Sequence, residues 1–267
     1  INFIRPELRE NPTTISIAEK NVLPDEIKVS DIKGALHIHT SWSDGAESIE
    51  SMVESAISLG FEYIGFCDHS RAAFYANGLT PERLEKQWTE IDAIQKKYKN
   101  IKIFKGIESD ILKDGSLDYP DSILKQFDFI VASIHSNFTL SYEEMTNRLV
   151  QAATNKYTTI LGHPSGRLLL SRESYKFDWE KVITACKKNN TALELNSDEH
   201  RLDVSVKIIE RVIKEGIKIS INSDAHQSNS LKNIEYGVGM ANKTLIQKKD
   251  ILNAYSADDF VRIIKKA

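Results

Sequence analysis

Cysteine is scarce in this chain, whose 267 residues include only Cys67 and Cys186. Two cysteines that do not form a CxxC pair cannot build a disulfide framework, so we expect buried thiols and a reducing compartment. Long apolar runs are also missing, since no stretch approaches the roughly 18 residues of a membrane span. The N-terminal residues are charged and lack the apolar segment of a signal peptide. These absences favour a cytoplasmic protein with no membrane partner.

An excess of basic residues is absent as well. Lysine and arginine total 35 against 38 aspartate and glutamate residues, which gives a net charge of -3. No global positive field is therefore available to attract nucleic acid, and any attraction for phosphate must be local. The remaining composition, 41% hydrophobic and 27% charged, is that of an ordinary globular protein. A single α/β barrel of about 200 to 250 residues would account for most of the chain.

Residues 1–30 differ from the rest because they are polar, interrupted by proline and only weakly periodic. We expect them to form an N-terminal arm or interdomain linker, followed by one domain over residues 31–267. The first residue is isoleucine rather than methionine. We therefore also expect the chain to be part of a longer protein, with the missing segment upstream of Ile1.

From residue 31 onwards, short β-branched runs alternate with longer amphipathic stretches. This alternation predicts repeated βα units and a parallel sheet. Strands are expected over residues 33–39, 63–67, 101–107, 129–134, 157–161, 192–195 and 217–221. Helices are expected over residues 49–59, 80–98, 120–126, 142–153, 179–189 and 204–215, with one or two more over 245–266.

The first predicted strand ends in a pair of histidines, His37 and His39. Because side chains alternate along a strand, the two imidazoles should share one face, while Leu36 and Ile38 should pack on the other. Neutral imidazole is the commonest metal ligand among side chains, and a carboxylate, Asp44, follows on the next loop. Alone, the pair is equally compatible with half of a metal site and with a polar stripe at a strand end.

Six of the seven histidines lie at or just past the C-terminal end of a predicted strand, and three carboxylates share this placement. In a parallel barrel these strand ends meet on one face, so the nine side chains should surround one pocket. They are His37, His39, Asp44, His69, Glu108, His135, His163, Asp224 and His226. Nine ligands exceed the roughly four of zinc or six of manganese, which predicts two or three metal ions. The seventh histidine, His200, has charged neighbours and is interpreted as a rim residue.

Such a centre would carry net positive charge. Three divalent ions would bring about +6, while the three carboxylates supply about -3 and the ligand histidines are neutral. Phosphate oxygens are the natural guests of this pocket. Bound metals lower the pKa of a shared water to about 7, polarise phosphoryl oxygens and stabilise the leaving oxygen. We therefore predict phosphoester hydrolysis without a nucleophilic side chain of the protein.

The motifs around these residues resemble those of the PHP (polymerase and histidinol phosphatase) family, most closely the C-terminal PHP domain of bacterial family X DNA polymerases. They are Leu36-His37-Ile38-His39-Thr40, Ser43-Asp44-Gly45, Asp68-His69-Ser70, Gly106-Ile107-Glu108, Ser133-Ile134-His135-Ser136, Gly162-His163-Pro164-Ser165-Gly166-Arg167 and Asp224-Ala225-His226. The similarity to family X comes from residues 111–119 and 236–239 and from arm residues 5–10. One position departs from the pattern, because Ala35 stands where the family usually carries an acidic residue.

The resemblance implies a distorted (βα)7, TIM-like barrel with a polynuclear metal site at the C-terminal ends of the strands. It implies three divalent ions, Zn2+ or Mn2+ or both, with Fe2+ as an alternative. One ion would be held by His37, His39, Glu108 and Asp224, a second by Glu108, His135 and His163, and a third by Asp44, His69 and His226.

For function, the resemblance implies a manganese-dependent 3'-5' exonuclease or a related DNA end-processing phosphodiesterase in DNA repair. Its substrate would be single-stranded DNA or 3' ends, and a family X polymerase core would precede the domain. Two alternatives remain open. The chain could be a histidinol-phosphatase-like phosphomonoesterase acting on a phosphorylated small molecule, or a metal-stabilised scaffold for a polymerase.

Substrate contacts are expected on the loops that follow the strands. Arg71, Arg167 and Arg201 could bind phosphate in bidentate fashion, or could be solvated surface arginines. Aromatic residues on the same loops could stack bases at the mouth of the pocket, or could pack down onto the barrel. These aromatics are Phe74, Tyr75 and Phe138.

Overall fold

A seven-stranded parallel sheet forms the centre of the computed structural model, which describes residues 3–9, 14–20 and 23–265. The strands are β1 (Gly34–Ile38), β2 (Tyr63–Phe66), β3 (Lys102–Asp110), β4 (Phe129–Ser133), β5 (Ile160–Leu161), β6 (Ala192–Asn196) and β7 (Ile219–Asn222). They lie side by side in sequence order, and every neighbouring pair is parallel. The predicted (βα)7 architecture is thereby confirmed.

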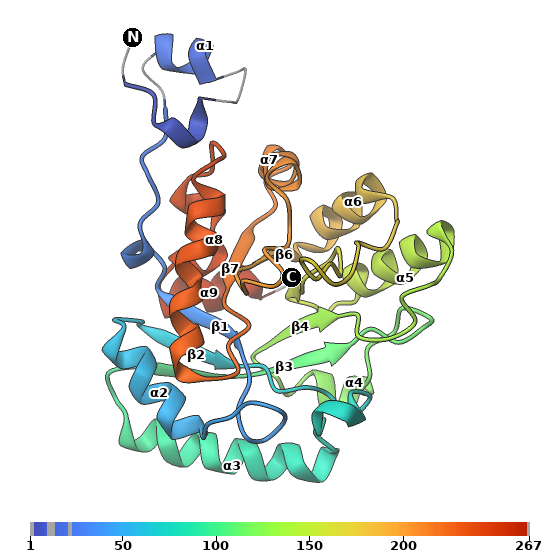
Figure 1. Ribbon diagram of the computed structural model, residues 1–267. Coiled ribbons are helices and arrows are strands. Elements are labelled where there is room, and N and C mark those ends of the chain that lie inside the picture. The colour runs from blue at the N-terminus through green and yellow to red at the C-terminus, as the bar shows by residue number, and fades with distance from the viewer. Residues whose placement is uncertain (1–2, 10–13, 21–22, 266–267) are drawn as a thin grey trace.

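Helices surround this sheet and cover its outer face (Figure 1). The α-helices are α1 (Thr14–Glu19), α2 (Ile49–Ser58), α3 (Pro81–Lys97), α4 (Asp121–Leu124), α5 (Tyr142–Thr154), α6 (Trp179–Asn189), α7 (Val206–Lys214), α8 (Ile234–Ala241) and α9 (Ala257–Ile264). The 3-10 helices are η1 (Pro6–Leu8), η2 (Val29–Asp31), η3 (Phe74–Ala76), η4 (Ser228–Asn233), η5 (Lys248–Asp250) and η6 (Leu252–Ala254). In the part of the chain that the structure describes, no helix combines the length and apolarity that crossing a membrane requires.

The sheet closes into a barrel where the first strand meets the last. Ile38 at the end of β1 pairs in parallel with Ala225, just beyond β7. Below this bridge, Asn253 fills the gap, since its amide donates to the carbonyls of Gly34 at 2.9 Å and Ile221 at 2.6 Å. Its side-chain oxygen accepts from the Ile221 amide at 3.0 Å. One side chain therefore completes the ladder that the two backbones leave open.

The end of the barrel opposite the histidines is filled by aromatic side chains. Phe260 of α9 lies with its ring centroid 5.3 Å from Tyr63 of β2, 5.3 Å from Phe104 of β3 and 6.0 Å from Phe129 of β4. All four rings are buried. This plug is aromatic, whereas the nine candidate ligands lie together at the other end.

Strand β1 departs from the strict alternation predicted for it. Leu36 packs in the interior cluster with Phe129, whereas Ile38 packs in the outer cluster between sheet and helices. The prediction that Leu36 and Ile38 share a face was therefore wrong. The cause is an irregularity in the β1–β2 register, where His37 takes a left-handed φ of 55°. This turn of the backbone brings His37 to the same side as His39 despite the broken alternation.

Several elements differ from prediction in extent. Strand β3 continues to Asp110, beyond the predicted end at Ile107, because it keeps its pairing with β4. Helix α8 was not predicted. The segment predicted to hold one or two C-terminal helices contains η5, η6 and α9, and Lys266 lies outside the described residues.

The predicted arm contains the short helices η1 and α1 and meets the barrel at Asn242, after α8. The Asn242 amide donates to the Ile27 carbonyl at 2.8 Å, and its oxygen accepts from the Ile27 amide at 2.9 Å and from Arg5 at 3.3 Å. Residues 1–2, 10–13 and 21–22 of the arm lie outside the described residues. The domain boundary near residue 31 remains a prediction.

Candidate metal centre

The structure brings all nine candidate ligands together at one end of the barrel. They form overlapping groups in which the ligand atoms lie within 4.8 Å of one another. The groups are His39, Asp44, His69 and His226; His37, Glu108 and His163; His37, His39 and Asp224; and His69, Glu108 and His135. The shared members make this a single connected centre.

Glu108, on β3, lies at the middle of the centre and is only 1% exposed. Its Oε1 lies 3.1 Å from His37 Nε2, 2.9 Å from His163 Nε2 and 3.2 Å from His135 Nε2. Its Oε2 lies 3.0 Å from His69 Nδ1. A carboxylate that faces imidazoles from four directions is suited to bridge two metal ions.

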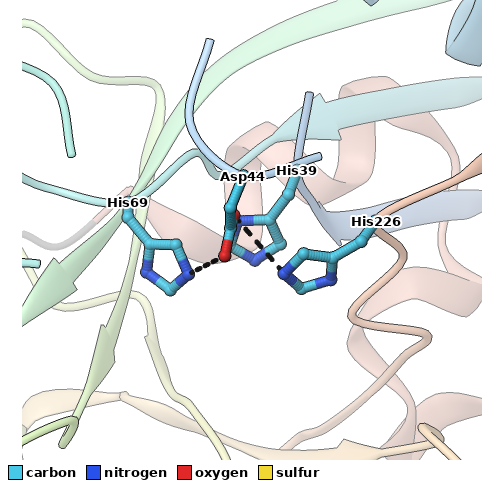
Figure 2. A group of neighbouring side chains, drawn as sticks. All are labelled: His39, Asp44, His69 and His226. Atoms are coloured by element: carbon cyan, nitrogen blue, oxygen red, sulfur yellow. Dashed lines mark ion pairs between the residues drawn. The ribbon is translucent and has the colours of Figure 1, made fainter. Parts of the chain in front are cut away.

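Asp44 forms a second focus, between His69 and His226 (Figure 2). Its carboxylate oxygens lie 3.5 Å from His69 Nε2, 3.5 Å from His226 Nε2 and 3.7 Å from His39 Nδ1. The His39 and His226 rings stack at 4.1 Å. Because Asp44 is 35% exposed, this part of the centre opens towards solvent.

Asp224, just beyond β7, faces both histidines of β1. Its Oδ1 lies 3.2 Å from His39 Nε2 and 3.5 Å from His37 Nε2. Its Oδ2 accepts a hydrogen bond from Asn196 at 3.0 Å and lies 3.4 Å from the Nε of Arg201. The two oxygens therefore have separate partners, one facing the imidazoles and one held in place.

Three of the candidate ligands have backbone conformations in the left-handed region. The φ angles are 55° at His37, 22° at His163 and 51° at Asp224. Non-glycine residues there cost on the order of 1 to 3 kcal/mol each, and such residues cluster at functional sites. The conformation turns each side chain from its strand end into the barrel mouth.

The donor set fits metal ions. In the part of the chain that the structure describes, buried imidazole nitrogens such as His37 Nε2, His39 Nε2 and His69 Nδ1 have no hydrogen-bond partner. Each nevertheless lies within 3.5 Å of a Glu108 oxygen. Buried polar atoms are normally hydrogen-bonded, so nitrogen and oxygen atoms that converge without such bonds are arranged for a shared cation.

Electrostatics in the protein alone show the same demand for positive charge. Burial would raise the pKa of Glu108, but the neighbouring His135 and His37 hold that pKa well below its usual range. Burial would lower the pKa of His69, but Glu108 and Asp44 raise it to about 10. Burial and the neighbouring His226 and His69 lower the pKa of His39 to about 3, so this imidazole keeps a free lone pair at neutral pH.

Glu194 of β6 was missed by the sequence analysis. Its Oε1 lies 2.6 Å from His37 Nδ1, and its Oε2 accepts from the His163 backbone amide at 2.6 Å. Asn222 and Asn196 also donate to it, at 2.7 and 3.2 Å. A carboxylate behind a ligand histidine fixes its tautomer and increases its basicity. The available signal was an acidic residue in the middle of a short apolar strand.

Two further carboxylates orient ligands and were also missed. Asp110 Oδ1 lies 2.5 Å from His135 Nδ1, and the signal was its position two residues beyond Glu108 on the same strand. Asp68 accepts from the Thr40 amide at 2.7 Å and from the Ser43 hydroxyl at 2.6 Å. Asp68 thereby fixes the loop that presents Asp44.

The three predicted phosphate-binding arginines have different surroundings. Arg201 lies against the ligand Asp224, and its side chain is 17% exposed. Arg167 donates to the backbone carbonyls of Arg201 at 2.9 Å and of Leu202, so it supports the segment that carries Arg201. Arg71 is 55% exposed and lies 3.4 Å from Asp118. Arg201 is thus the arginine placed at the ligands.

Other residues named in the sequence analysis have local partners or are exposed. The guanidinium carbon of Arg172 lies over the Phe138 ring, 4.1 Å from the ring centroid. Ser70 accepts from the Asp110 backbone amide at 2.9 Å, and His200 is exposed. Ala35, at the position that is usually acidic in the family, is buried in the outer hydrophobic cluster.

Comparison with known proteins identifies the fold. Residues 35–198 match the PHP domain family. The chain belongs to the PHP family. It is 41% identical over 264 residues to the DNA polymerase/3'-5' exonuclease PolX of Bacillus subtilis (strain 168), covering 99% of this chain and 46% of that protein. The PHP chain thus spans about half the length of this relative, and the predicted resemblance is confirmed.

Phosphatases also resemble this PHP chain. A probable phosphatase of Thermoanaerobacter sp. (strain X514) is 28% identical over 228 residues, covering 81% of this chain and 88% of that protein. The crystal structure of histidinol phosphate phosphatase from Lactococcus lactis subsp. lactis Il1403, complexed with zinc, L-histidinol and phosphate, superimposes with a TM-score of 0.58 at 19% identity. It covers 79% of this chain and 94% of that chain, which supports the shared fold.

Family membership and the ligand cluster together bear on the predicted chemistry. The prediction of a metal-dependent enzyme that acts on phosphoester bonds is confirmed at the level of the family. The choice among phosphoester substrates is not made by the fold, because phosphatases and a polymerase-associated exonuclease share it.

Proposed function

We propose that this PHP domain is a 3'-5' exonuclease or DNA end-processing phosphodiesterase that acts on single-stranded DNA or 3' ends in DNA repair. The observation that carries the chemistry is the convergence of nine ligand side chains around Glu108. The substrate class is supported by the 41% identity to a protein named as a DNA polymerase and 3'-5' exonuclease.

The proposal includes three divalent ions, Zn2+ or Mn2+ or both, with Fe2+ as an alternative. The proposed sets are His37, His39, Glu108 and Asp224; Glu108, His135 and His163; and Asp44, His69 and His226. Divalent ions in such sites supply Lewis acidity and a hydroxide nucleophile near neutral pH. Glu194 holds His37 in one tautomer, and Asp110 does the same for His135. Arg201, at the edge of the centre, can bind a phosphate oxygen of the substrate.

The organisation of the protein is part of the same proposal. Residues 31–267 would be the catalytic PHP domain, residues 1–30 an arm or linker, and a family X polymerase core would precede them in a cytoplasmic protein. The arm runs from η1 to the barrel and is held there through Asn242.

A histidinol-phosphatase-like phosphomonoesterase is the second candidate. It is supported by the 28% identity to a probable phosphatase and would use the same centre on a phosphorylated small molecule. A metal-stabilised scaffold is a third candidate. The large ligand set weighs against it, because a structural zinc site is usually closed by about four ligands.

The test uses a 5'-labelled single-stranded oligonucleotide and Mn2+. The purified protein should shorten it stepwise from the 3' end, and Asp224→Asn or His39→Ala should reduce the rate by about a hundredfold or more, because each removes a ligand. His200→Ala is the matched control, since this histidine is exposed and outside the ligand groups. Full activity in both ligand variants would refute the proposed centre. A preference for histidinol phosphate would favour the monoesterase, and bound metal without hydrolysis of either substrate would favour the scaffold.

A further inference from the structure

Two adjacent aromatic side chains are exposed beside the metal centre. Phe74 is 86% exposed and Tyr75 is 62% exposed, while Ala73 and Ala76 on either side are buried. Single exposed apolar residues are ordinary, whereas these two adjacent aromatic rings form a small exposed apolar patch beside the candidate metal centre.

The loop that carries these rings is firmly built. The loop follows β2 and begins at His69. It returns to His69 at its other end, where the Leu79 amide donates to the His69 carbonyl at 2.8 Å. The Gly78 amide donates to the Ala73 carbonyl at 3.1 Å. A Cβ atom at Gly78 would lie 2.0 Å from the Ser70 carbonyl oxygen, so glycine is required for this close return.

Side chains from outside the loop brace it further. Arg83 of α3 donates to the Asn77 carbonyl at 2.6 Å and also to the carbonyl of Trp42. Asp118 accepts from the Ala72 amide at 2.6 Å. Because the backbone is fixed on both sides, the exposure of the two aromatic rings is a stable feature of the fold rather than a fraying loop.

The two rings lead outwards from the metal ligands. The Tyr75 ring lies 6.5 Å from the His69 ring, and the Phe74 ring lies edge-on to Tyr75 at 6.0 Å. Partial burial and the nearby carboxylates of Asp110 and Glu108 raise the pKa of the Tyr75 hydroxyl, which places Tyr75 within the field of the centre. A substrate held at the ligands would therefore meet Tyr75 first and Phe74 next.

Positive charge accompanies this aromatic path. Arg172 is held by the Gly166 carbonyl at 2.8 Å and by the Phe138 ring. Burial and the like charge of Arg201 lower the pKa of the Arg172 guanidinium, whereas Tyr175 and Tyr75 act to raise it. The repulsion between these two guanidinium groups would be relieved by an anion, such as the phosphodiester backbone of a nucleic-acid strand.

We propose that Tyr75 and Phe74 form a stacking platform for the bases next to the scissile phosphodiester, so that this loop selects a nucleic-acid strand over a base-free phosphoester. The inference rests on the proposed nuclease function and identifies its specificity residues. Base–aromatic stacking is tolerant of sequence because every base has a π-face, and the loss of one stacking ring typically weakens binding by roughly tenfold. A phosphoester that carries no aromatic ring would gain nothing from this platform.

The test compares two single-stranded oligonucleotides that differ only at the two 3'-terminal nucleotides, which carry bases in one and are abasic tetrahydrofuran analogues in the other. The wild-type protein with Mn2+ should favour the base-carrying strand by about tenfold or more in kcat/KM, mainly through KM. A double variant, Phe74→Ala with Tyr75→Ala, should reduce this ratio to near one without lowering kcat/KM on the abasic strand. Tyr157→Ala is the control, since Tyr157 precedes β5 and lies at the other end of the barrel.

Binding provides a second readout that does not depend on turnover. A 2-aminopurine base at the 3' end, with phosphorothioate linkages to slow hydrolysis, should be quenched by the wild-type protein through stacking and should stay bright with the double variant. The variant should keep the wild-type melting temperature and metal content, because both side chains are exposed.

The outcomes separate this inference from the proposed function. If the wild-type protein cleaves both strands equally, or if the double variant keeps the preference and the quenching, the platform is refuted while the nuclease stands. If the metal-loaded wild-type protein cleaves neither strand, both the nuclease and the platform fail.

Discussion

Single side chains behind the candidate ligands hold those ligands in place. Glu194 is fully buried and contacts one ligand side chain, His37, and the backbone of another, His163. Burial would raise the pKa of Glu194, but His37 lowers it, so the carboxylate stays charged at neutral pH. This negative charge is compensated by the centre itself, which couples Glu194 to whatever cation the ligands hold.

Glu194→Gln should weaken metal binding. The amide keeps the size of the side chain but removes the charge and the acceptor that faces His37, so metal affinity should fall by about tenfold to a hundredfold. Competition with a fluorescent chelator measures it. Glu199→Gln, at an exposed position, is the control and should bind as the wild type does. An unchanged affinity in the Glu194 variant would show that its contact with His37 does not tune the site.

At this scale the sequence located the nine clustered residues but not their supports. The nine side chains stand out because each lies at or just past a strand end, where parallel strands converge. Glu194 lies within β6, and Asp110 lies three residues past the end predicted for its strand, where β3 in fact continues. Only a known strand extent and register tell which face an acidic residue occupies. The left-handed turn at His37 was equally hidden, since the chain carries no glycine there to signal it.

At the scale of elements, the loops after β5 and β6 are joined through a buried carboxyl group. Asp203, between β6 and α7, accepts from the Ser165 amide at 2.9 Å, close to the ligand His163. Among the described residues, its second oxygen, Oδ1, has no hydrogen-bond partner. Burial raises the pKa of Asp203 from 3.8 to about 6. The loop that carries His163 is therefore held by the Asp203 carboxyl, whose burial disfavours its ionised form.

This pKa predicts a pH-dependent stability. The folded protein binds the Asp203 proton more tightly than the unfolded chain does. Ionisation of this buried carboxyl therefore lowers the free energy of unfolding, and this loss is absent below about pH 4 and complete above about pH 6. Asp203→Asn, which keeps the acceptor for Ser165, should raise the free energy of unfolding above pH 6 by up to about 3 kcal/mol and flatten its fall between about pH 4 and 6. Urea titrations across this range measure it. Asp25→Asn, at an exposed position, should keep the wild-type profile, and an identical profile for the Asp203 variant would contradict the argument.

Most elements were predictable because their hydrophobic periodicity agrees with the capping and terminating residues at their ends. Helix α2, for example, begins after its N-cap Ser48 and is followed by Gly60 at a φ of 83°. Helix α8 was not predictable in this way, since Gly237 and Gly239 lower its helical propensity. Its position is set by packing, because a Cβ atom at Gly237 would lie 2.1 Å from the Ser197 hydroxyl oxygen. Such close packing between distant segments determines where α8 forms, and the local sequence pattern does not reveal it.

At the scale of the whole molecule, the centre concentrates negative charge inside the barrel. Glu108 and Glu194 are almost completely buried, and Asp224 is 7% exposed. In the protein alone, histidines supply the compensating positive charge, as the raised pKa of His37 and His135 indicates. Bound cations would take over this role and join strands from both halves of the barrel.

Removal of metal should lower the melting temperature. A ligand at a hundredfold excess over its Kd stabilises the folded state by about 2.7 kcal/mol, which corresponds to roughly 5 to 10 °C for a domain of this size. Calorimetry before and after dialysis against EDTA measures the shift, and added Mn2+ or Zn2+ should restore it. In Asp224→Asn the metal-dependent part of the shift should shrink. Equal melting temperatures with and without metal would argue against an occupied centre.

The bridge that closes the barrel lies among the candidate metal ligands. Ile38 stands between His37 and His39, and its partner Ala225 stands between Asp224 and His226. Most of the chain separates these two segments, so both must be synthesised before either the ring or the ligand set is complete. A nascent chain whose residues 219–226 have not yet emerged from the ribosome should therefore bind metal poorly. Metal uptake during synthesis would then report the closure of the barrel.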